Sequence, residues 1–359
     1  MSGTEDIVAG ERSEHVSETT GGVVGGGRPI TRETRTRKRM MVFAGTTHPA
    51  LAEEIAQHLG INLSGTKISR FASGEIYVRS IESARGADAF VIQTHADPIN
   101  ESIMEQLLMI DALKRASAKR ITAVIPYYGY SRQDHKALAR EPISAKLVAD
   151  LLTVAGADRV ISVDLHSGQI QGFFDFPVDH LTGLPLLAEH LSKRFPDPSD
   201  LVVVAPDAGR VKTAERLGKE LRADLAFIYK RRSKHEAHKI EQVLVVGEVD
   251  GRRCVLIDDM IDTGGTVVEG AKALAAAGAS EIFAACTHPV LSGKAVQRIA
   301  ESPIRELVVT NTLPLPGEKR AVLGDRLTVL SIAPIVASAL DAVFQDESVS
   351  EIFHGDNQA

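Results

Sequence analysis

The chain has 359 residues, of which 44% are hydrophobic and 25% charged, and its formal net charge is −6. This length is typical of about two globular domains, and the acidic balance gives no general case for binding nucleic acid or a membrane. A site for an anionic ligand must therefore be a local cluster of basic residues. The two cysteines, Cys254 and Cys286, lie in apolar strand-like runs and form no disulfide framework, which is typical of a reducing cytoplasm.

Residues 1–39 are rich in Gly, Ser, Thr and Glu and contain few large apolar residues, so we expect a disordered N-terminal tail. Its end, from Arg28 to Arg39, is basic, and a solvated leader is favoured over an arm that binds nucleic acid or a partner. No apolar run reaches the roughly 18 residues of a membrane-spanning helix. The first residues do not resemble a signal peptide. We therefore expect a cytoplasmic protein without a membrane or nucleic-acid partner.

From Met40 onward, short runs of β-forming residues alternate with segments whose apolar residues recur at helical spacing. Helices are expected after the loop that ends at Pro49, from a cap at Asn100 and from a cap at Ser144. Strands alternating with helices are typical of an α/β fold with a doubly wound parallel sheet, and the strands are too many for one compact sheet, so two such domains are predicted. The strands are expected at residues 41–44, 90–93, 121–126, 159–163, 201–205, 255–257, 281–285 and 306–310.

The stretch 255–266 is the most informative part of the chain. A buried strand is followed at once by Asp258 and Asp259, then by a turn from Asp262 to Thr266 and a helical segment. Ligands of open α/β sheets bind at the carboxyl ends of strands. A glycine turn that leads into a helix can hold a phosphate through backbone N–H groups, whereas the carboxylates suit hydroxyl groups or a divalent cation. The stretch therefore predicts a sugar-phosphate site, in preference to an ordinary turn with solvated acids.

Two loops contain residue types that can bind a nucleotide. The turn from Phe71 to Glu75 offers a ring that can stack on a base and a carboxylate, although Phe71 taken alone is more often a core residue. The loop that contains Arg132, Gln133 and Arg140 follows a strand directly, and guanidinium groups recognise phosphates. A charged surface loop is the alternative interpretation of the second cluster.

Three further clusters follow strands. His166 could bind a metal, act as a general base or be an ordinary structural histidine. Together with Asp207, in the motif APDAGR, it could hold hydrated magnesium, partly through water because magnesium prefers oxygen ligands. The basic segment 229–239 could close as a lid over a polyphosphate. It could also be a solvated loop or a nucleic-acid patch, and its few aromatic residues weaken the last possibility.

The ordered blocks resemble those of the ribose-phosphate pyrophosphokinase (phosphoribosyl pyrophosphate synthetase) family, class I bacterial type. The resemblance extends from about Met40 to Phe353 and includes RFASGE, SRQDHK, SVDLHSGQ, APDAGR and VLIDDMIDTGGT. It implies two phosphoribosyltransferase-type domains at 40–182 and 183–340, followed by a C-terminal tail at 341–359. It also implies that the β,γ-diphosphoryl group of ATP moves to the 1-hydroxyl of ribose 5-phosphate, which gives AMP and phosphoribosyl pyrophosphate for nucleotide biosynthesis.

The resemblance also implies roles for individual residues, and the 71–75 turn can come from a neighbouring subunit in such enzymes. ATP contacts are implied for Phe71, Ser73, Gly74, Glu75, Arg132 and Gln133. Ribose 5-phosphate contacts are implied for Arg232, Asp258, Asp259, Asp262, Thr263, Gly264, Gly265 and Thr266. Mg²⁺ contacts are implied for His166 and Asp207, and catalytic roles for Lys230, Arg232 and His166.

Assembly and regulation are implied only by the same resemblance. It suggests a homo-hexamer that phosphate and ADP regulate through the loop from Arg132 to Arg140 and through Ser348–Ser350. Two rival functions remain. A phosphoribosyltransferase would share the sugar-phosphate loop but lack the ATP-binding blocks, and a non-catalytic regulatory subunit would be indicated by loss of Lys230, Arg232 or His166, all of which are present.

Overall fold

The structure is a computed structural model that describes residues 38–232 and 240–353. The predicted tail, residues 1–39, lies outside the described residues except for Lys38 and Arg39, and so does most of the basic segment 229–239. Within the described residues, no helix is both long enough and apolar enough to span a membrane.

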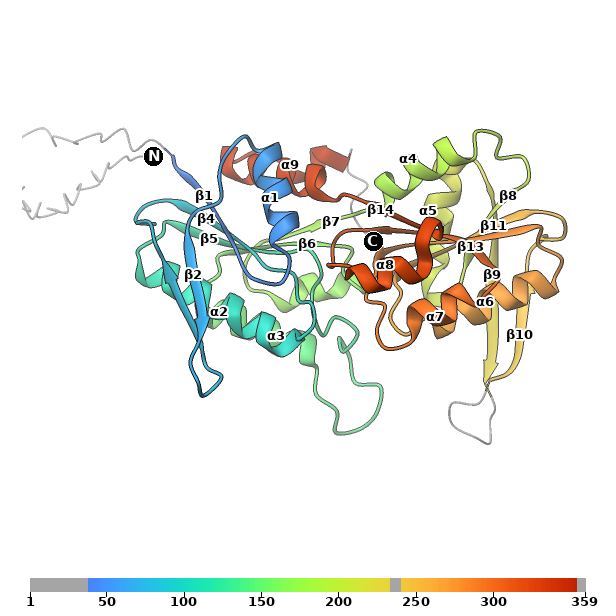
Figure 1. Ribbon diagram of the computed structural model, residues 1–359, viewed down its shortest axis with the longest axis horizontal. Helices are drawn as coiled ribbons and strands as arrows, with labels where there is room; N and C mark the ends of the chain where they lie inside the picture. The colour runs from blue at the N-terminus through green and yellow to red at the C-terminus, as the bar shows by residue number, and fades with distance from the viewer. Residues whose placement is uncertain (1–37, 233–239, 354–359) are drawn as a thin grey trace, which may run out of the picture. The chain divides into compact units, whose positions relative to one another are not determined.

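The first sheet has five strands, all parallel, in the order β1-β4-β5-β6-β7. Helices α2 and α3 cover the face on which Phe43 and Val91 are buried, and α1 and α9 cover the face of Val42 and Phe90 (Figure 1). Successive residues of one strand thus enter two different cores. The strands are β1 (Met40–Ala44), β4 (Asp88–Ile92), β5 (Arg120–Ile125), β6 (Arg159–Val163) and β7 (Val178–Leu181). The helices are α1 (Pro49–His58), α2 (Ile99–Arg115), α3 (Ser144–Ala155) and α9 (Ala333–Gln345).

The second sheet has seven strands in the order β10-β9-β8-β11-β12-β13-β14, and only β10 is antiparallel to its neighbour. Helices α6 and α7 pack on one face and α4 and α5 on the other. The strands are β8 (Leu201–Ala205), β9 (Asp224–Arg232), β10 (Ile240–Val246), β11 (Arg253–Met260), β12 (Glu281–His288), β13 (Ile304–Thr310) and β14 (Leu327–Leu330). The helices are α4 (Leu184–Arg194), α5 (Val211–Leu221), α6 (Gly265–Ala276) and α7 (Ala295–Ala300).

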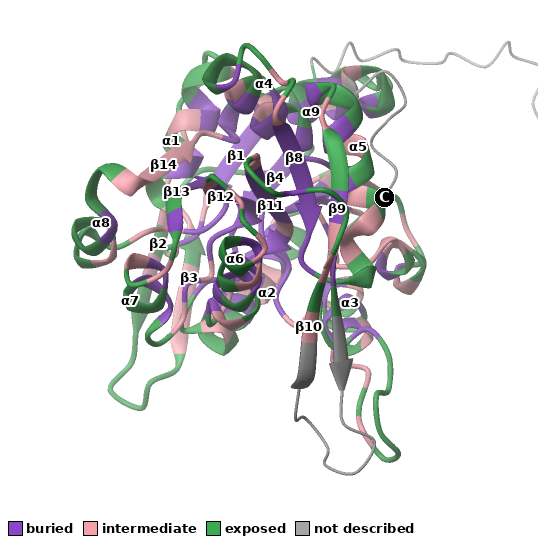
Figure 2. Cartoon of the chain, turned by 90° about the vertical axis from the view of Figure 1, so that its right-hand side faces the viewer, coloured by how far each residue is buried: buried purple, intermediate pink, exposed green. Residues whose placement is uncertain are grey.

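Figure 2 shows why the strands are continuous apolar runs: β8 and β11 are buried at the centre, while the helices expose one side. Parallel strands with helices on both faces have no solvated side, so both residue parities are apolar. This confirms the predicted α/β fold with two doubly wound parallel sheets. The short elements are a hairpin of β2 (Thr66–Arg70) and β3 (Ile76–Ser80), helix α8 (Gly317–Leu323), and the 3-10 helices η1 (Gly168–Phe173), η2 (Ala208–Arg210), η3 (Gly324–Arg326) and η4 (Val349–Phe353).

The structure differs from the expected chain organisation after residue 332. Helix α9 does not belong to the second sheet but returns to the first, where Val336 and Leu340 pack in the same core as Val42 and Phe90. Residues expected in a C-terminal tail complete this helix and form η4. The reason is the apolar face of α9, which can be buried only against a partner such as α1 and the first sheet.

Two predicted helix caps were wrong. Helix α2 begins after Pro98, so Asn100 lies inside its first turn. Helix α3 begins at Ser144 with Ile143 as its N-cap, and the Ser144 hydroxyl donates instead to Gln133 Oε1 at 2.6 Å. The serine is therefore used to hold the loop of Gln133, which lies beside the candidate site.

Candidate active site

The acid pair lies where β11 ends, at the carboxyl edge of the second sheet. Asp258 stands opposite Cys286 on β12, and Asp259 is only 8% exposed. Burial, followed by the neighbouring Asp259, raises the pKa of Asp258 well above its ordinary value. Burial also opposes ionisation of Asp259, but a hydrogen bond from His166 and the charge of Arg210 outweigh it and lower its pKa to about 2. Asp259 is therefore the ionised member of the pair.

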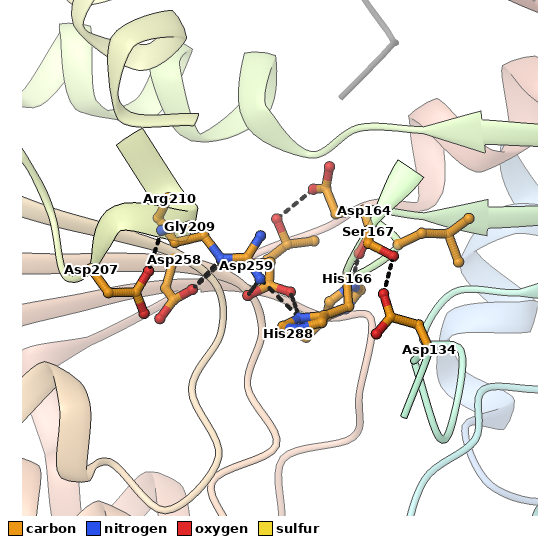
Figure 3. A network of polar contacts seen from close by, with 12 residues as sticks. Asp134, Asp164, His166, Ser167, Asp207, Gly209, Arg210, Asp258, Asp259 and His288 are labelled. Carbon is orange, nitrogen blue, oxygen red and sulfur yellow. Dashed lines mark hydrogen bonds and ion pairs between the residues drawn. The ribbon is translucent and has the colours of Figure 1, made fainter. Parts of the chain in front are cut away.

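Arg210, the last residue of η2, holds both carboxylates. Its Nε lies 3.1 Å from Asp258 Oδ1 and its Nη2 lies 2.9 Å from Asp259 Oδ1 (Figure 3). The guanidinium is only 14% exposed, so this ion pair is weakly screened by solvent. Arg210 belongs to the motif APDAGR, but the sequence pattern predicted no role for it. The feature that could have indicated a role for Arg210 is its position three residues after Asp207, at the end of a predicted strand.

His166, which follows β6 of the first sheet, reaches the same carboxylates. Its Nδ1 lies 2.7 Å from Asp259 Oδ2 and 2.8 Å from Arg210 Nη2, and one ring nitrogen cannot satisfy both (Figure 3). The ionised Asp259 can only accept, and Arg210 Nη2 has Asp259 Oδ1 as its own acceptor, so Nδ1 carries the proton and donates it to Asp259 Oδ2. In the neutral ring this leaves the lone pair on Nε2, the arrangement typical of a histidine that binds a metal.

The predicted phosphate loop follows β11 and ends in the first turn of α6. Gly264 is the N-cap residue, with φ +75°, and no side chain caps the helix. A Cβ atom at Gly264 would make only ordinary van der Waals contact, 3.4 Å from the carbonyl oxygen of Ala295, so this position suits glycine by its backbone conformation and not by a lack of space. The N–H groups of the first helical turn have no intrahelical partners, and the helix dipole adds positive potential. The turn can therefore bind an anion.

One cavity brings most of the predicted residues together. Arg132, from the first domain, enters it through an ion pair of 2.7 Å between its Nη2 and Asp262 Oδ2. The predicted site residues that line the cavity are Arg132, His166, Asp207, Asp258, Asp259, Asp262, Thr263, Gly264, Gly265 and Thr266, and Arg210 lines it with them. Residues distant in sequence thus meet where the carboxyl ends of the two sheets face each other.

The loop that contains Arg132 is fixed by a buried carboxylate. Asp134 accepts hydrogen bonds from Ser167 Oγ and, at 3.0 Å, from Gln169 Nε2 (Figure 3). Burial of Asp134 is outweighed by the hydrogen bonds from Ser167 and His135, which lower its pKa. Because Ser167 follows His166 directly, Asp134 links the Arg132 loop to the His166 loop.

The predicted adenine turn does not reach this cavity within the described chain. Phe71, Ser73, Gly74 and Glu75 lie at the exposed tip of the β2–β3 hairpin, and Phe71 is 57% exposed, so its interpretation as a core residue was wrong. A second cavity lies beside the first and shares Arg132 with it. Its other lining residues are Asp97–Glu101, Tyr127, Tyr130, Ser131 and Gln133.

The predicted catalytic residues Lys230 and Arg232 belong to the end of β9, which pairs with β10. Their side chains lie outside the described residues, as do residues 233–239. Their roles therefore stay predictions from the sequence.

The site offers a metal ion few side-chain ligands within the described residues. No group of three or more His, Cys, Asp or Glu in the described part of the chain could hold a metal ion. Asp207 Oδ1 accepts from the N–H of Gly209 at 2.9 Å, so the carboxylate is oriented by its own turn. One carboxylate and the Nε2 lone pair of His166 fit an ion that keeps several waters and binds substrate phosphates, as Mg²⁺ does.

The fold and the cavity define an α/β enzyme that handles a sugar phosphate. Residues 40–156 match the N-terminal domain of ribose phosphate pyrophosphokinase, and residues 237–354 match the phosphoribosyl synthetase-associated domain. The ribose-phosphate pyrophosphokinase of Streptomyces avermitilis is 56% identical over 321 residues, which are 89% of this chain and 98% of the relative. That of Mycobacterium leprae is 54% identical over 324 residues, 90% and 98% of the two chains.

Phosphoribosylpyrophosphate synthetase from Mycobacterium smegmatis has a crystal structure that matches this fold with a TM-score of 0.81. The two chains are 52% identical, and the match covers 86% of this chain and 100% of the other. The chain belongs to the ribose-phosphate pyrophosphokinase family. It is a diphosphotransferase, and enzymes of this family use a metal ion.

Proposed function

We propose that the cavity at the carboxyl ends of β6, β8 and β11 transfers the β,γ-diphosphoryl group of ATP to the 1-hydroxyl of ribose 5-phosphate. The products are AMP and phosphoribosyl pyrophosphate. The observation that carries the proposal is the meeting, in one cavity, of an uncapped glycine turn, a carboxylate pair and an arginine from the other domain. A sugar phosphate fits the first two features, and a polyphosphate fits the third.

The acceptor sugar binds at the second sheet. Backbone N–H groups of the turn from Thr263 to Thr266 hold the 5-phosphate at the N-terminus of α6. Asp258, Asp259 and Asp262 accept hydrogen bonds from ribose hydroxyls. Arg210 keeps the first two carboxylates in place before the sugar enters, since its guanidinium contacts both. The phosphate and the hydroxyls of one ligand thus have separate partners on one short stretch of chain.

The donor nucleotide binds from the first domain. Arg132 lines both cavities, so a diphosphoryl group bound to it lies at their boundary, with Gln133 beside the second cavity. Phe71, Ser73, Gly74 and Glu75 are exposed and outside both cavities, so they contact ATP bound to a neighbouring subunit of a homo-hexamer. A site completed by two subunits accounts for a ring as large as Phe71 at an exposed hairpin tip.

Charge stabilisation carries most of the rate acceleration in transfers of this kind. Lys230 and Arg232 provide cations to the transferred group, and His166 with Asp207 holds Mg²⁺. When bound, Mg²⁺ supplies positive charge to the phosphate groups. His166 is oriented for this role because Asp259 accepts its Nδ1 proton.

A third polar cavity supports regulation by phosphate or ADP. The predicted segment Ser348–Ser350 lines it, together with Arg120 and Arg159. Both arginines are paired with carboxylates, Arg120 with Asp88 at 2.6 Å and Arg159 with Asp179 at 2.5 Å. The loop from Arg132 to Arg140 does not line this cavity, so its predicted regulatory role has no support from the described chain.

We place the enzyme in the cytoplasm. Cys254 and Cys286 are buried free thiols, and burial raises the pKa of Cys254 to about 11. Neither thiol pairs with the other, as expected for a reducing compartment.

The deciding experiment incubates purified protein with ATP, ribose 5-phosphate, Mg²⁺ and inorganic phosphate. We expect AMP to form at the same rate as phosphoribosyl pyrophosphate. Consumption of phosphoribosyl pyrophosphate with a nucleobase, without AMP release from ATP, would indicate a phosphoribosyltransferase. No turnover in either assay would indicate a non-catalytic subunit.

A further inference from the structure

The sugar-phosphate loop, residues 261–266, lies beside a stretch of chain that we call the supporting segment, residues 288–298. The two run side by side through backbone hydrogen bonds: Ile261 N donates to His288 O at 3.0 Å, Leu291 N to Ile261 O at 2.9 Å and Ser292 N to Asp262 O at 3.0 Å. Further along, Arg298 Nη1 donates to Thr263 O at 2.9 Å. Hydrogen bonds from the supporting segment thus fix the backbone of residues 261–263, which lead into the phosphate-binding turn.

The supporting segment is itself fixed. His288 is 1% exposed, with Nδ1 at 2.9 Å from Thr312 Oγ1 and Nε2 at 3.0 Å from Val163 O of the first sheet. Leu291 has a φ of +46°, a conformation that a leucine rarely adopts, and its side chain is fully buried in the second core. Burial holds this backbone in place although the conformation is unfavourable by about 1–2 kcal/mol. A strained residue beside a ligand loop is typical of a functional constraint.

Ser292 connects the supporting segment to a carboxylate of the loop through its side chain. Its hydroxyl donates to Asp262 Oδ1, while Arg132 pairs with the other oxygen of the same carboxylate, Oδ2. Ser292 is half-buried, and the Asp262 side chain is 21% exposed. With each oxygen held by a different partner, the carboxylate plane cannot rotate. Ser292 therefore holds the carboxylate of the sugar loop through the oxygen that Arg132 does not contact.

We infer that Ser292 is a positioning residue for the reaction: it touches no substrate but holds Asp262 in the orientation that grips the sugar and meets Arg132. The inference rests on the proposed function, because Asp262 has a substrate only if this cavity binds ribose 5-phosphate. It predicts a specific defect. The fold and the nucleotide affinity are preserved, whereas ribose 5-phosphate binds more weakly.

The test compares Ser292→Ala, Ser292→Thr and the control Ser302→Ala in the full-length protein. The Ser302 hydroxyl also makes local hydrogen bonds, donating to Ile299 O at 2.7 Å and accepting from Ile304 N at 3.2 Å, but these partners line neither cavity, whereas the partner of Ser292, Asp262, lines the first. Ribose 5-phosphate affinity is measured by calorimetry, KM for each substrate by AMP release, and Tm by calorimetry. A hydrogen bond to a charged group corresponds to roughly a tenfold change in affinity, so Ser292→Ala should weaken ribose 5-phosphate binding by about that factor.

The control and the threonine variant should bind ribose 5-phosphate like the unaltered protein, and no variant should change KM for ATP by more than about twofold. A double-mutant cycle with Asp262→Ala then isolates the contact, because the effect of Ser292→Ala should disappear once its partner is gone. The cycle tests the Ser292–Asp262 contact even if the extra methyl group of Ser292→Thr does not fit at this position.

Equal ribose 5-phosphate affinity of Ser292→Ala and the unaltered protein would overturn the inference, and so would an undiminished effect in the Asp262→Ala background. A parallel rise of both KM values with a lower Tm would mean a merely structural serine. If the unaltered protein itself binds no ribose 5-phosphate, the proposed function fails, which is a separate result.

Discussion

The two halves of the cavity are built differently. The sugar half has its loop fixed by a parallel segment, its carboxylates held by Arg210 and its glycine turn buried at Gly264. The nucleotide half consists of exposed Arg132 and Gln133, and its predicted adenine turn lies at a hairpin tip outside the cavity. Under the proposed function, one chain therefore forms the acceptor site before any ligand arrives, whereas the donor site is completed by ATP and a second subunit.

This difference has an energetic meaning. A preorganised site loses little conformational entropy when its ligand binds, whereas an exposed one must order its side chains at that moment. Contacts that pair buried charges in the sugar half, such as those of Arg210, should therefore affect both folding and ribose 5-phosphate affinity. Contacts in the nucleotide half should affect ATP affinity and turnover with little change in stability. The following predictions test this division, beginning with the largest effect.

Lys230→Ala should lower kcat by roughly 10²–10³-fold, the effect of removing one group that stabilises charge in a transition state. Ribose 5-phosphate affinity should change little, because the sugar half is complete without this residue. Rapid-quench measurement of AMP formation and calorimetric binding separate the two quantities. The matched control is Lys219→Ala, whose side chain pairs with Glu215 at 2.9 Å on the surface of α5. Near-normal turnover of Lys230→Ala would remove its catalytic assignment.

Arg210→Leu should destabilise the protein by about 3–5 kcal/mol, because it leaves the buried, ionised Asp259 without its cation and Asp258 without a hydrogen-bond donor. Denaturant unfolding measures this loss, and ribose 5-phosphate affinity should fall with it. Arg216→Leu is a poor control because Arg216 lines a cavity together with Arg210 and the two aspartates, so Arg222→Leu, at the exposed C-cap of α5, is preferred. A stability equal to that of the unaltered protein would show that the acid pair is preorganised by another group.

Thr266→Ala should raise KM for ribose 5-phosphate by up to roughly tenfold, the effect of one hydrogen bond to a charged group. KM for ATP should stay the same, because Thr266 lies on the sugar loop and not at the second cavity. Steady-state kinetics with each substrate varied in turn provides the measurement. A selective loss of ATP affinity would reverse the assignment of the two halves.

Phe71→Ala should raise KM for ATP by about fivefold, an estimate of about 1 kcal/mol for one stacking contact. The free energy of unfolding should change by less than about 0.5 kcal/mol, because the ring is exposed. Chemical denaturation of the protein in its native assembly checks the second quantity. A large loss of stability with unchanged ATP affinity would make Phe71 an interface residue only.

Much of the fold could be predicted because each central strand is a pure apolar run with a polar residue at its end. The runs of β8 and β11, buried on both faces, are examples. The edge elements β7, β10 and β14 and the β2–β3 hairpin were missed, because their residues are only partly buried and the apolar pattern is broken. The caps at Asn100 and Ser144 failed because a local preference was overruled by tertiary contacts, as with Ser144 and Gln133.

The site divides in the same way. Asp258, Asp259 and the glycine turn could be predicted because their chemistry is contiguous in the sequence. Arg210 and Ser292 could not be assigned a role, because each depends on a partner brought near only by the sheet. The sequence predicted a functional role for His166, but which ring nitrogen carries the proton depends on Asp259 from the other sheet. A local residue pattern does not show which residues distant in the sequence will contact each other in the folded site.

The return of α9 to the first sheet affects how the chain folds during synthesis. The core that holds Val42 and Phe90 is closed by Val336 and Leu340, which are translated only after all strands of the second sheet. Residues 40–182 therefore emerge first but wait for α9 before this face is covered, against the usual order in which N-terminal domains fold as they appear. A chain that stops before α9 would carry an open apolar face, and neither half can be separated as an independent unit by a single cut.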